Sequence, residues 1–217
     1  MKFKYLEFQL QFITHGTDDQ EIIHQVKEVL EGGGRWIQLR AKHYSKTDFL
    51  NLAQKIKSLT DAYKAVFIIN DHINIAKQVE ASGVHIGTND ITPNEAREIL
   101  GPQFIIGGTA NDIETIDRIR PNVDYIGLGP FRFTSTKKKL SPCLGIDGYK
   151  RVVDKTRKES NIPIVTIGGI VKSDIQELLQ LDVQGIATSS GLTKKSNNTI
   201  SKETALWIKE IKLCQKN

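Results

Sequence analysis

The chain has 217 residues, of which 39% are hydrophobic and 25% charged, as in an ordinary soluble globular protein that can bury a core without disulfides. Its two cysteines have no partner spacing, and it shows neither a secretory h-region nor an apolar run near the ~20 residues of a membrane span, so we expect a cytoplasmic protein without membrane partners. The net charge is +5, but the lysines are scattered and the densest group, residues 137–139, has no interleaved aromatic residues, which argues against nucleic-acid binding and is compatible with anionic substrates.

Eight short apolar runs alternate with helical patterns along the chain. Each run is rich in Ile, Val, Leu or Phe, which predicts strands that are buried on both faces. In chain order, the expected strands are Phe8–Thr14, Trp36–Arg40, Val66–Asn70, Gly83–Ile86, Phe104–Gly107, Tyr125–Leu128, Ile164–Gly168 and Gly185–Thr188.

Apolar residues at helical spacing fill the gaps between these runs. The clearest helices are expected at Asp18–Glu31, Thr47–Thr60, from Pro93 onward, Ser173–Leu179 and Ser201–Leu213. Asp18 or Thr17 is a suitable cap for the first helix, and Thr92 followed by Pro93 and Glu95 has the spacing of a capping box. A serine cap is expected at the start of the helix near residue 173.

The alternation predicts an α/β fold, a (β/α)8 TIM barrel that forms one domain over residues 1–217. An open doubly wound sheet is the alternative, but it would place a glycine-rich dinucleotide loop after the first strand, and the stretch from Ile13 to Thr17 lacks that pattern. The stretch at about residues 131–145 has no periodic apolar face, and we expect it to be a flexible flap over the rim of the barrel.

Cationic and acidic side chains gather where the expected strands end. Gln38, Arg40 and Lys42 alternate along one strand end, so their side chains point the same way, and Arg and Lys both suit phosphate. A solvated strand end is the alternative. Asp71 and Asp90 follow two adjacent strands and could share Mg²⁺ together with substrate phosphates, although Asn70 and Asp71 could also be ordinary helix caps, and Asp90 could cap a turn.

Hydroxyl and glycine residues follow the later strands. Gly107-Gly108-Thr109 ends the fifth, and the loops after the seventh and eighth carry Gly168-Gly169 and Thr188-Ser189-Ser190-Gly191. Loops seven and eight of such barrels often hold a phosphate, which predicts a second phosphate site apart from the Arg/Lys/Asp cluster. His85, inside a strand, is expected to be a packed, hydrogen-bonded interior residue.

Taken together, these residues resemble the thiamine phosphate synthase family over nearly the whole chain. The resemblance rests on five segments in order, which are Gln38-Leu39-Arg40-Ala41-Lys42, Asn70-Asp71 with Ala76, Gly83-Val84-His85-Ile86-Gly87 with Asp90, Gly129-Pro130 with Thr134-Ser135-Thr136-Lys137, and Ile167-Gly168-Gly169-Ile170. It implies a transferase of thiamine biosynthesis. Such an enzyme condenses 4-amino-2-methyl-5-hydroxymethylpyrimidine diphosphate with 4-methyl-5-(2-hydroxyethyl)thiazole phosphate, or its carboxylated form, to thiamine monophosphate and pyrophosphate.

The resemblance also implies roles for individual residues. Gln38, Arg40, Lys42, Asn70, Thr109 and Lys137 would bind the pyrimidine diphosphate, with Arg40, Lys42, Thr109 and Lys137 taking part in catalysis. Asp71 and Asp90 would bind Mg²⁺. Thr134, Thr136, Gly168, Ser189 and Ser190 would hold the thiazole phosphate. Partners would be these phosphorylated small molecules, and self-association into a homo-oligomer is left open.

The chain departs from the family pattern at a few positions. Thr109 stands where serine is usual, Phe133 replaces a usual proline, and the first strand ends in Thr14-His15 where aspartate is common. None of these changes removes a proposed metal or phosphate ligand.

Three alternative functions are compatible with the same barrel. A thiazole tautomerase-like paralogue would not need the set formed by Arg40, Lys42, Asp71, Asp90 and Lys137. A non-catalytic protein that binds thiamine precursors could lose that set and keep Gly168, Ser189 and Ser190, yet both halves are present. Other phosphate-binding barrels would require a catalytic lysine or carboxylate inside the barrel, and the strands offer none.

Overall fold

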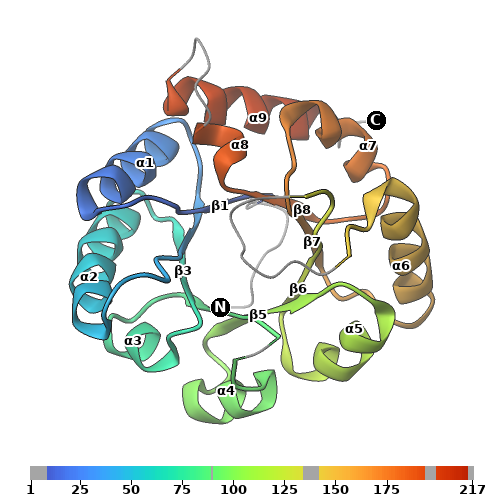
Figure 1. Ribbon diagram of the computed structural model, residues 1–217, viewed down its shortest axis with the longest axis horizontal. Helices are drawn as coiled ribbons and strands as arrows, with labels where there is room; N and C mark the ends of the chain where they lie inside the picture. Colours follow the sequence, from blue (N-terminus) through green and yellow to red (C-terminus); the bar gives the residue numbers. More distant parts are fainter. Residues whose placement is uncertain (1–8, 89, 134–141, 194–198, 215–217) are drawn as a thin grey trace.

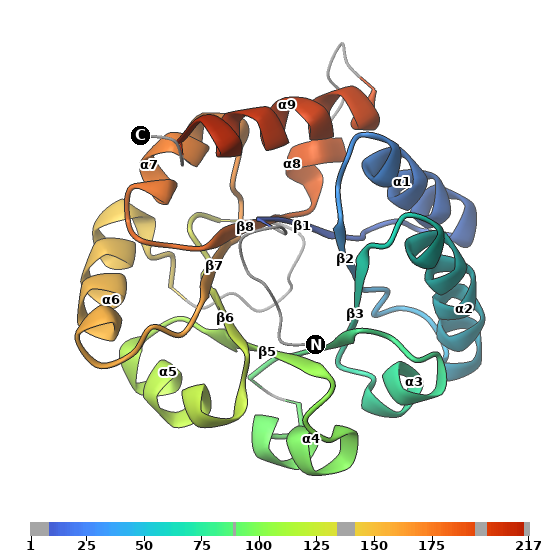
Figure 2. The ribbon, with the colours of Figure 1, turned by 180° about the vertical axis from the view of Figure 1, so that it is seen from behind.

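Eight parallel strands close into a barrel in the order β1 to β8, with β8 pairing back onto β1. This computed structural model describes residues 9–88, 90–133, 142–193 and 199–214. Helices surround the strands on the outside (Figures 1 and 2). The predicted (β/α)8 fold is therefore confirmed.

The strands lie close to their expected positions. They are β1 (Leu10–Ile13), β2 (Trp36–Leu39), β3 (Val66–Asn70), β4 (Gly83–Ile86), β5 (Ile105–Ala110), β6 (Tyr125–Leu128), β7 (Ile164–Ile167) and β8 (Gly185–Thr188). The helices are α1 (Asp19–Glu31), α2 (Lys46–Ala62), α3 (Ile73–Gln78), α4 (Pro93–Leu100), α5 (Ile113–Ile119), α6 (Gly145–Glu159), α7 (Ile175–Leu179), α8 (Ser190–Thr193) and α9 (Ile200–Cys214), with short 3-10 turns at Arg120–Asn122 and Lys172–Asp174.

The core is divided by the barrel wall into two apolar clusters. Successive side chains of a strand point to opposite faces, so most strands supply both clusters. The large cluster, with Phe12, Ile37 and Ile126 among its members, fills the space between strands and helices. The small cluster fills the barrel interior and consists of Ile13, Trp36, Ile68, Tyr125, Val165 and Ala187. Burial on both faces explains why the strands read as continuous apolar runs.

The fifth strand extends further than expected. It was predicted to end at Gly107, but the pairing continues as Gly108 stands opposite Ile126, Thr109 opposite Gly127 and Ala110 opposite Leu128. The glycines therefore belong to the strand and not to the loop after it. As a result, Thr109 is held by a strand of the barrel wall.

Caps fix the starts of α1 and α4 as predicted, whereas the expected serine cap is absent. Asp18 accepts a hydrogen bond from the backbone N–H of Glu21, and Thr92 and Glu95 form the expected capping box. The prediction of a serine cap at Ser173 is wrong, because this residue lies in the 3-10 turn before α7, which begins at Ile175. The carboxylate of Asp174 instead accepts from the N–H of Val171 and forms an ion pair with Arg132.

The C-terminal helix completes the outer ring. In both views α9 lies between α1 and α7, next to the junction of β1 and β8 (Figures 1 and 2). Its buried Trp207 and Ile211 belong to the large cluster. Within the described ranges, none of the helices has the length and apolar character needed to cross a membrane.

The described ends of the predicted flap are tied to the barrel. The backbone N–H groups of Phe131 and Arg132 donate to the carbonyls of Ile167 and Gly168, and the N–H of Leu144 donates to the carbonyl of Pro130. The middle of the flap, residues 134–141, lies outside the described residues, so its flexibility stays a prediction.

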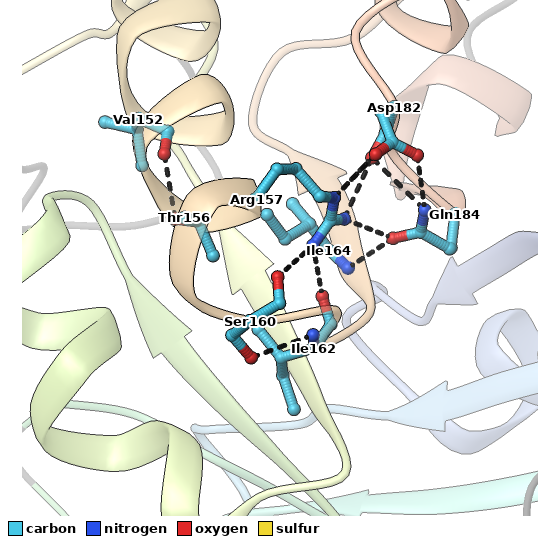
Figure 3. A network of polar contacts seen from close by, with 8 residues as sticks. All are labelled: Val152, Thr156, Arg157, Ser160, Ile162, Ile164, Asp182 and Gln184. Carbon is cyan, nitrogen blue, oxygen red and sulfur yellow. Dashed lines mark hydrogen bonds and ion pairs between the residues drawn. The ribbon is translucent and has the colours of Figure 1, made fainter.

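Arginine side chains fasten the loops at the amino ends of the strands. Figure 3 shows Arg157 reaching from α6 to the segment before β8, where it donates to the side-chain oxygen of Gln184 at 2.6 Å and to the carbonyl of Asp182 at 2.8 Å. It also donates to the carbonyl of Ile162, and Gln184 accepts from the N–H of Ile164 at the start of β7. One guanidinium thus joins α6 to the segments that precede β7 and β8.

We expect Arg157→Lys to lower the free energy of unfolding by about 1–3 kcal/mol, because an ammonium group cannot reproduce the planar set of donors. Urea denaturation at neutral pH measures the change. The matched control is Arg151→Lys, an exposed position on the same helix, where little change is expected. Equal stability of both variants would contradict the role given to Arg157.

Candidate active site

A cavity of about 200 Å³ opens at the carboxyl ends of the strands. This is the end of the barrel at which (β/α)8 enzymes carry out their chemistry. Ten of the predicted site residues line it, namely Gln38, Arg40, Lys42, Asn70, Asp71, Asp90, Thr109, Gly168, Ser189 and Ser190. The other three, Thr134, Thr136 and Lys137, lie outside the described residues.

The end of β2 contributes the predicted cations. Gln38 points into the barrel and is 2% exposed, whereas Lys42 is exposed at the rim. The backbone of Arg40 is fixed by Thr14 of the β1 loop, whose hydroxyl accepts from the Arg40 N–H at 2.9 Å. Partial burial lowers the pKa of the Arg40 guanidinium, and the charge of Asp71 partly offsets this. Arginine keeps its charge at neutral pH in any case, so the pocket holds a partly desolvated cation.

Two carboxylates face this cationic edge from β3 and β4. Lys42 Nζ lies 3.2 Å from Asp71 Oδ2, and Asp90 accepts a hydrogen bond from the N–H of Gly87 at 2.9 Å. Burial raises the pKa of Asp71 to about 6, and the contact with Asp90 adds to the shift, while Lys42 opposes it. Asp71 therefore carries its charge at a cost in free energy, because it is half-buried and lies beside another carboxylate.

The interpretation of Asn70 and Asp71 as helix caps is wrong. Asn70 belongs to β3, Asp71 has a left-handed backbone with φ 64°, and α3 begins at Ile73 after His72. This conformation is unusual for a residue with a side chain and places the carboxylate in the pocket instead of at a helix end. Asp90 does cap its own turn through Gly87, and it also reaches the pocket.

The carboxylate pair fits a magnesium ion. Within the described ranges, no group of three or more His, Cys, Asp or Glu side chains could form a complete metal cage. Mg²⁺ does not need one, because it is commonly held by one or two carboxylates, with water and substrate phosphates as further ligands. A carboxylate whose charge is disfavoured by burial and by a neighbouring carboxylate gains from a bound cation, which fits such a site.

A chain of buried hydrogen bonds crosses the barrel beneath the pocket. Gln38 donates to Gln11 at 3.2 Å, Gln11 donates to the Tyr125 hydroxyl at 3.2 Å, and that hydroxyl lies 3.0 Å from His85 Nδ1. His85 Nε2 in turn lies 2.9 Å from the hydroxyl of Thr109. This chain holds Gln38 and Thr109, which lie on opposite sides of the cavity floor. We name these five residues the interior relay.

Sequence reasoning identified only part of the interior relay. His85 was correctly predicted to be an interior hydrogen-bonded residue, but its place in the pocket lining, and the roles of Gln11 and Tyr125, were missed. The signal lay in two strand glycines. A Cβ at Gly107 would come within 2.1 Å of the Tyr125 ring, and one at Gly127 within 2.9 Å of the His85 ring. Glycine inside a strand often marks such a close approach.

Glycines and hydroxyls form the opposite wall of the cavity. Gly168 and Gly169 have φ of 101° and 70°, which a residue with a side chain rarely adopts. Arg132 fixes this loop by donating to the carbonyl of Gly169 at 3.0 Å and by pairing with Asp174. Ser189 and Ser190 follow β8 beside it. The two predicted phosphate sites therefore share one cavity, with cations on one wall and hydroxyls and backbone on the other.

Comparisons with known proteins agree with this geometry. A family model described as thiamine monophosphate synthase matches residues 10–192. Thiamine-phosphate synthase of Flavobacterium johnsoniae is 43% identical over 88% of this chain and 92% of its own, and that of Phocaeicola vulgatus is 45% identical over 86% and 90%. Among solved structures, thiamine phosphate pyrophosphorylase from Pyrococcus furiosus superposes with a TM-score of 0.82 at 28% identity, over 97% of this chain and 98% of its own.

The Asp71 carboxylate is half-buried, and we expect its replacement by a neutral residue to increase stability in a pH-dependent way. Because its pKa is higher in the folded than in the unfolded chain, folding takes up a proton between about pH 4 and 6, and the wild-type free energy of unfolding falls as pH rises through this range. We expect Asp71→Asn to be more stable than wild type by about 1 kcal/mol at pH 7.5, after discounting for solvent screening, and equally stable near pH 4.

Urea denaturation at several pH values, without divalent cations, measures this difference. The matched control is Asp154→Asn, which changes an exposed carboxylate on α6 and should give no such trend. A difference between Asp71→Asn and wild type that does not change with pH would contradict the explanation.

Proposed function

The chain belongs to the thiamine monophosphate synthase family and is a thiamine-phosphate synthase, and we propose that it joins hydroxymethylpyrimidine diphosphate to hydroxyethylthiazole phosphate within the single cavity described above. The products would be thiamine monophosphate and pyrophosphate. The observation that carries the substrate assignment is the division of one cavity into a cationic wall and a hydroxyl-rich wall. Two phosphorylated substrates that must meet need two such walls.

The cationic wall suits the diphosphate. Arg40 offers a fork of donors to phosphate oxygens and Lys42 a compact charge, and both lie beside the carboxylate pair. Lys42 pairs with Asp71 at 3.2 Å in the free protein, so it is already held at the place where charge would develop. Lys137, which lies outside the described residues, is proposed as a further cation for the same group.

Asp71 and Asp90 are proposed to hold Mg²⁺. When bound, this ion would neutralise charge on the diphosphate and so make pyrophosphate a better leaving group. The two carboxylates would keep it at the end of β3 and β4, next to Asn70, whose buried amide faces the same cavity. Its arrival would also compensate the buried charge of Asp71.

The floor of the cavity is proposed to hold the pyrimidine ring. Gln38 and Thr109 present polar groups there, and the interior relay fixes both against rotation. A fixed donor and acceptor on the floor can orient a heterocycle that carries an amino group and ring nitrogens. The methylene carbon that reacts would then lie between the floor and the diphosphate.

The hydroxyl-rich wall is proposed to hold the thiazole phosphate. Gly168, Ser189 and Ser190 would contact its phosphate through hydroxyl and backbone N–H groups, as loops seven and eight do in many barrels. Thr134 and Thr136 are proposed for the same substrate and lie outside the described residues. This wall faces the cationic wall, so the thiazole nitrogen could approach the methylene carbon opposite to the departing pyrophosphate.

The proposed reaction needs positioning and charge stabilisation in place of a general base. The pyrimidine amino group can stabilise a positive methylene carbon by delocalisation, which favours a dissociative path. The attacking thiazole nitrogen loses no proton when it is alkylated. Arg40 and Lys42 would stabilise the charge that builds on the departing oxygens, and the two walls would hold the substrates in reach of each other.

The decisive experiment mixes the purified protein with both substrates and Mg²⁺ and follows pyrophosphate and thiamine monophosphate together. We expect equal amounts of the two products, formed only when the thiazole substrate is present, and loss of both when EDTA removes the metal. Pyrophosphate released without the thiazole substrate would show hydrolysis alone, and absence of both products would contradict the proposed reaction.

We expect Asp90→Ala to lower turnover roughly 10²–10³-fold at fixed Mg²⁺, the scale of losing one electrostatic stabiliser. Part of the loss should be recovered at higher Mg²⁺, because Asp71 remains. Steady-state kinetics over a range of Mg²⁺ concentrations measure both effects, with Asp154→Ala as the matched control. Turnover close to that of wild type would exclude Asp90 as a metal ligand.

A further inference from the structure

His15 lies directly behind the hydroxyl-rich wall, and both of its ring nitrogens are engaged. Nδ1 lies 2.8 Å from the Ser189 hydroxyl and Nε2 lies 2.9 Å from the Thr193 hydroxyl. These contacts join the end of β1 to the segment after β8, because Phe12 stands opposite Thr188 in the ladder that closes the barrel. Ser189 lines the cavity, so one side chain separates His15 from a ligand there.

The His15 ring is set up to be neutral in the free protein. Burial lowers its pKa, and the charge of Glu21 opposes this only in part. Facing it from α1 are Glu21 and Gln25, whose amide oxygen accepts from the His15 backbone N–H at 3.4 Å, and from the β8 side the hydroxyls of Ser189 and Thr193. A neutral imidazole donates from one nitrogen and accepts at the other, so the two hydroxyls must take opposite roles.

We propose that His15 is a positioning residue for phosphate binding, which orients the Ser189 hydroxyl so that its proton points at a phosphate monoester in the cavity. In this arrangement Thr193 donates to Nε2, Nδ1–H donates to Ser189 Oγ, and the Ser189 O–H is left to donate to the phosphate. All three hydrogen bonds then run in one direction and end on the ligand. The ligand class is a phosphate monoester, and its identity as the thiazole phosphate rests on the proposed function.

The same arrangement links phosphate binding to the protonation of His15. A phosphate bound to Ser189 would be separated from His15 by this one side chain. Its negative charge favours the charged imidazolium, so phosphate is expected to raise the pKa of His15. Glu21, the other anionic group that acts on the ring, is present in both states and does not cancel the difference. At low pH, wild type should therefore bind phosphate more tightly than a variant that has no titrating group at position 15.

Two variants separate positioning from packing. In His15→Asn the side-chain amide nitrogen can take the place of Nδ1 and still donate to Ser189, whereas in His15→Gln the amide reaches the place of Nε2 and contacts Thr193 instead. We expect His15→Gln to raise the KM for hydroxyethylthiazole phosphate about tenfold with a much smaller change in kcat and in the KM for the pyrimidine diphosphate. His15→Asn should fall between His15→Gln and wild type.

A double-mutant cycle tests whether His15 acts through Ser189. If it does, adding His15→Gln to Ser189→Ala should cost little more than Ser189→Ala alone. Fully additive losses would overturn the proposal, as would equal KM values for His15→Gln and wild type. His24→Gln, at an exposed position on α1, is the matched control.

Titration of the full-length protein with inorganic phosphate tests the proposal without any enzymatic reaction. Ring signals of the five histidines are followed by NMR and that of His15 is assigned by its loss in His15→Asn. We expect phosphate to raise the pKa of His15. If phosphate raises the pKa of His15 but the protein forms no thiamine phosphate, the inference is supported and the proposed function fails. If the protein forms thiamine phosphate but neither phosphate nor the thiazole phosphate changes the pKa of His15, the inference is overturned and the proposed function stands.

Discussion

The closed ladder of parallel strands is the constraint on which the site depends. Pairing of β2 with β3 brings Lys42 to Asp71, pairing of β3 with β4 brings Asp71 to Asp90, and pairing of β8 with β1 brings Ser189 to His15. Each contact joins residues that lie far apart or in different loops, and each follows from the register of one strand pair. A shift of one residue in any pair would turn the side chains to the other face of the wall and remove the contact.

The two ends of the barrel show opposite uses of charge. At the amino ends of the strands, Arg157 satisfies several carbonyl and amide oxygens, and Arg97 does the same for the carbonyls of Gly101 and Phe104 and for Asp124. At the carboxyl ends, Asp71 is half-buried beside another carboxylate and has a left-handed backbone. The paired arginines stabilise the fold. The charge of Asp71 is paired with Lys42 at 3.2 Å but is disfavoured by burial and by Asp90, which suits it to bind a ligand cation.

The interior relay supports the pocket from inside the barrel. Tyr125 is wholly buried in the small apolar cluster, yet its hydroxyl joins Gln11 to His85 and so supports residues on both sides of the pocket floor. A buried polar chain of this kind is costly unless every member has a partner. Gly107 of β5 and Gly127 of β6 make the space for the rings of Tyr125 and His85.

The sequence by itself determined where the eight strands lie, the starts of α1, α2, α4 and α9, and the carboxyl-end residues of the pocket, because burial on both faces and helix capping leave local patterns. It did not determine that β5 continues to Ala110, that Asp71 has a left-handed backbone and lies outside α3, or that Ser173 is no cap. Only the tertiary structure decided these points, along with the interior relay and the contact of His15 with Ser189. They depend on which residues the pairing of neighbouring strands brings together in the closed barrel. These residues are far apart in the sequence, so no local sequence pattern predicts their contacts.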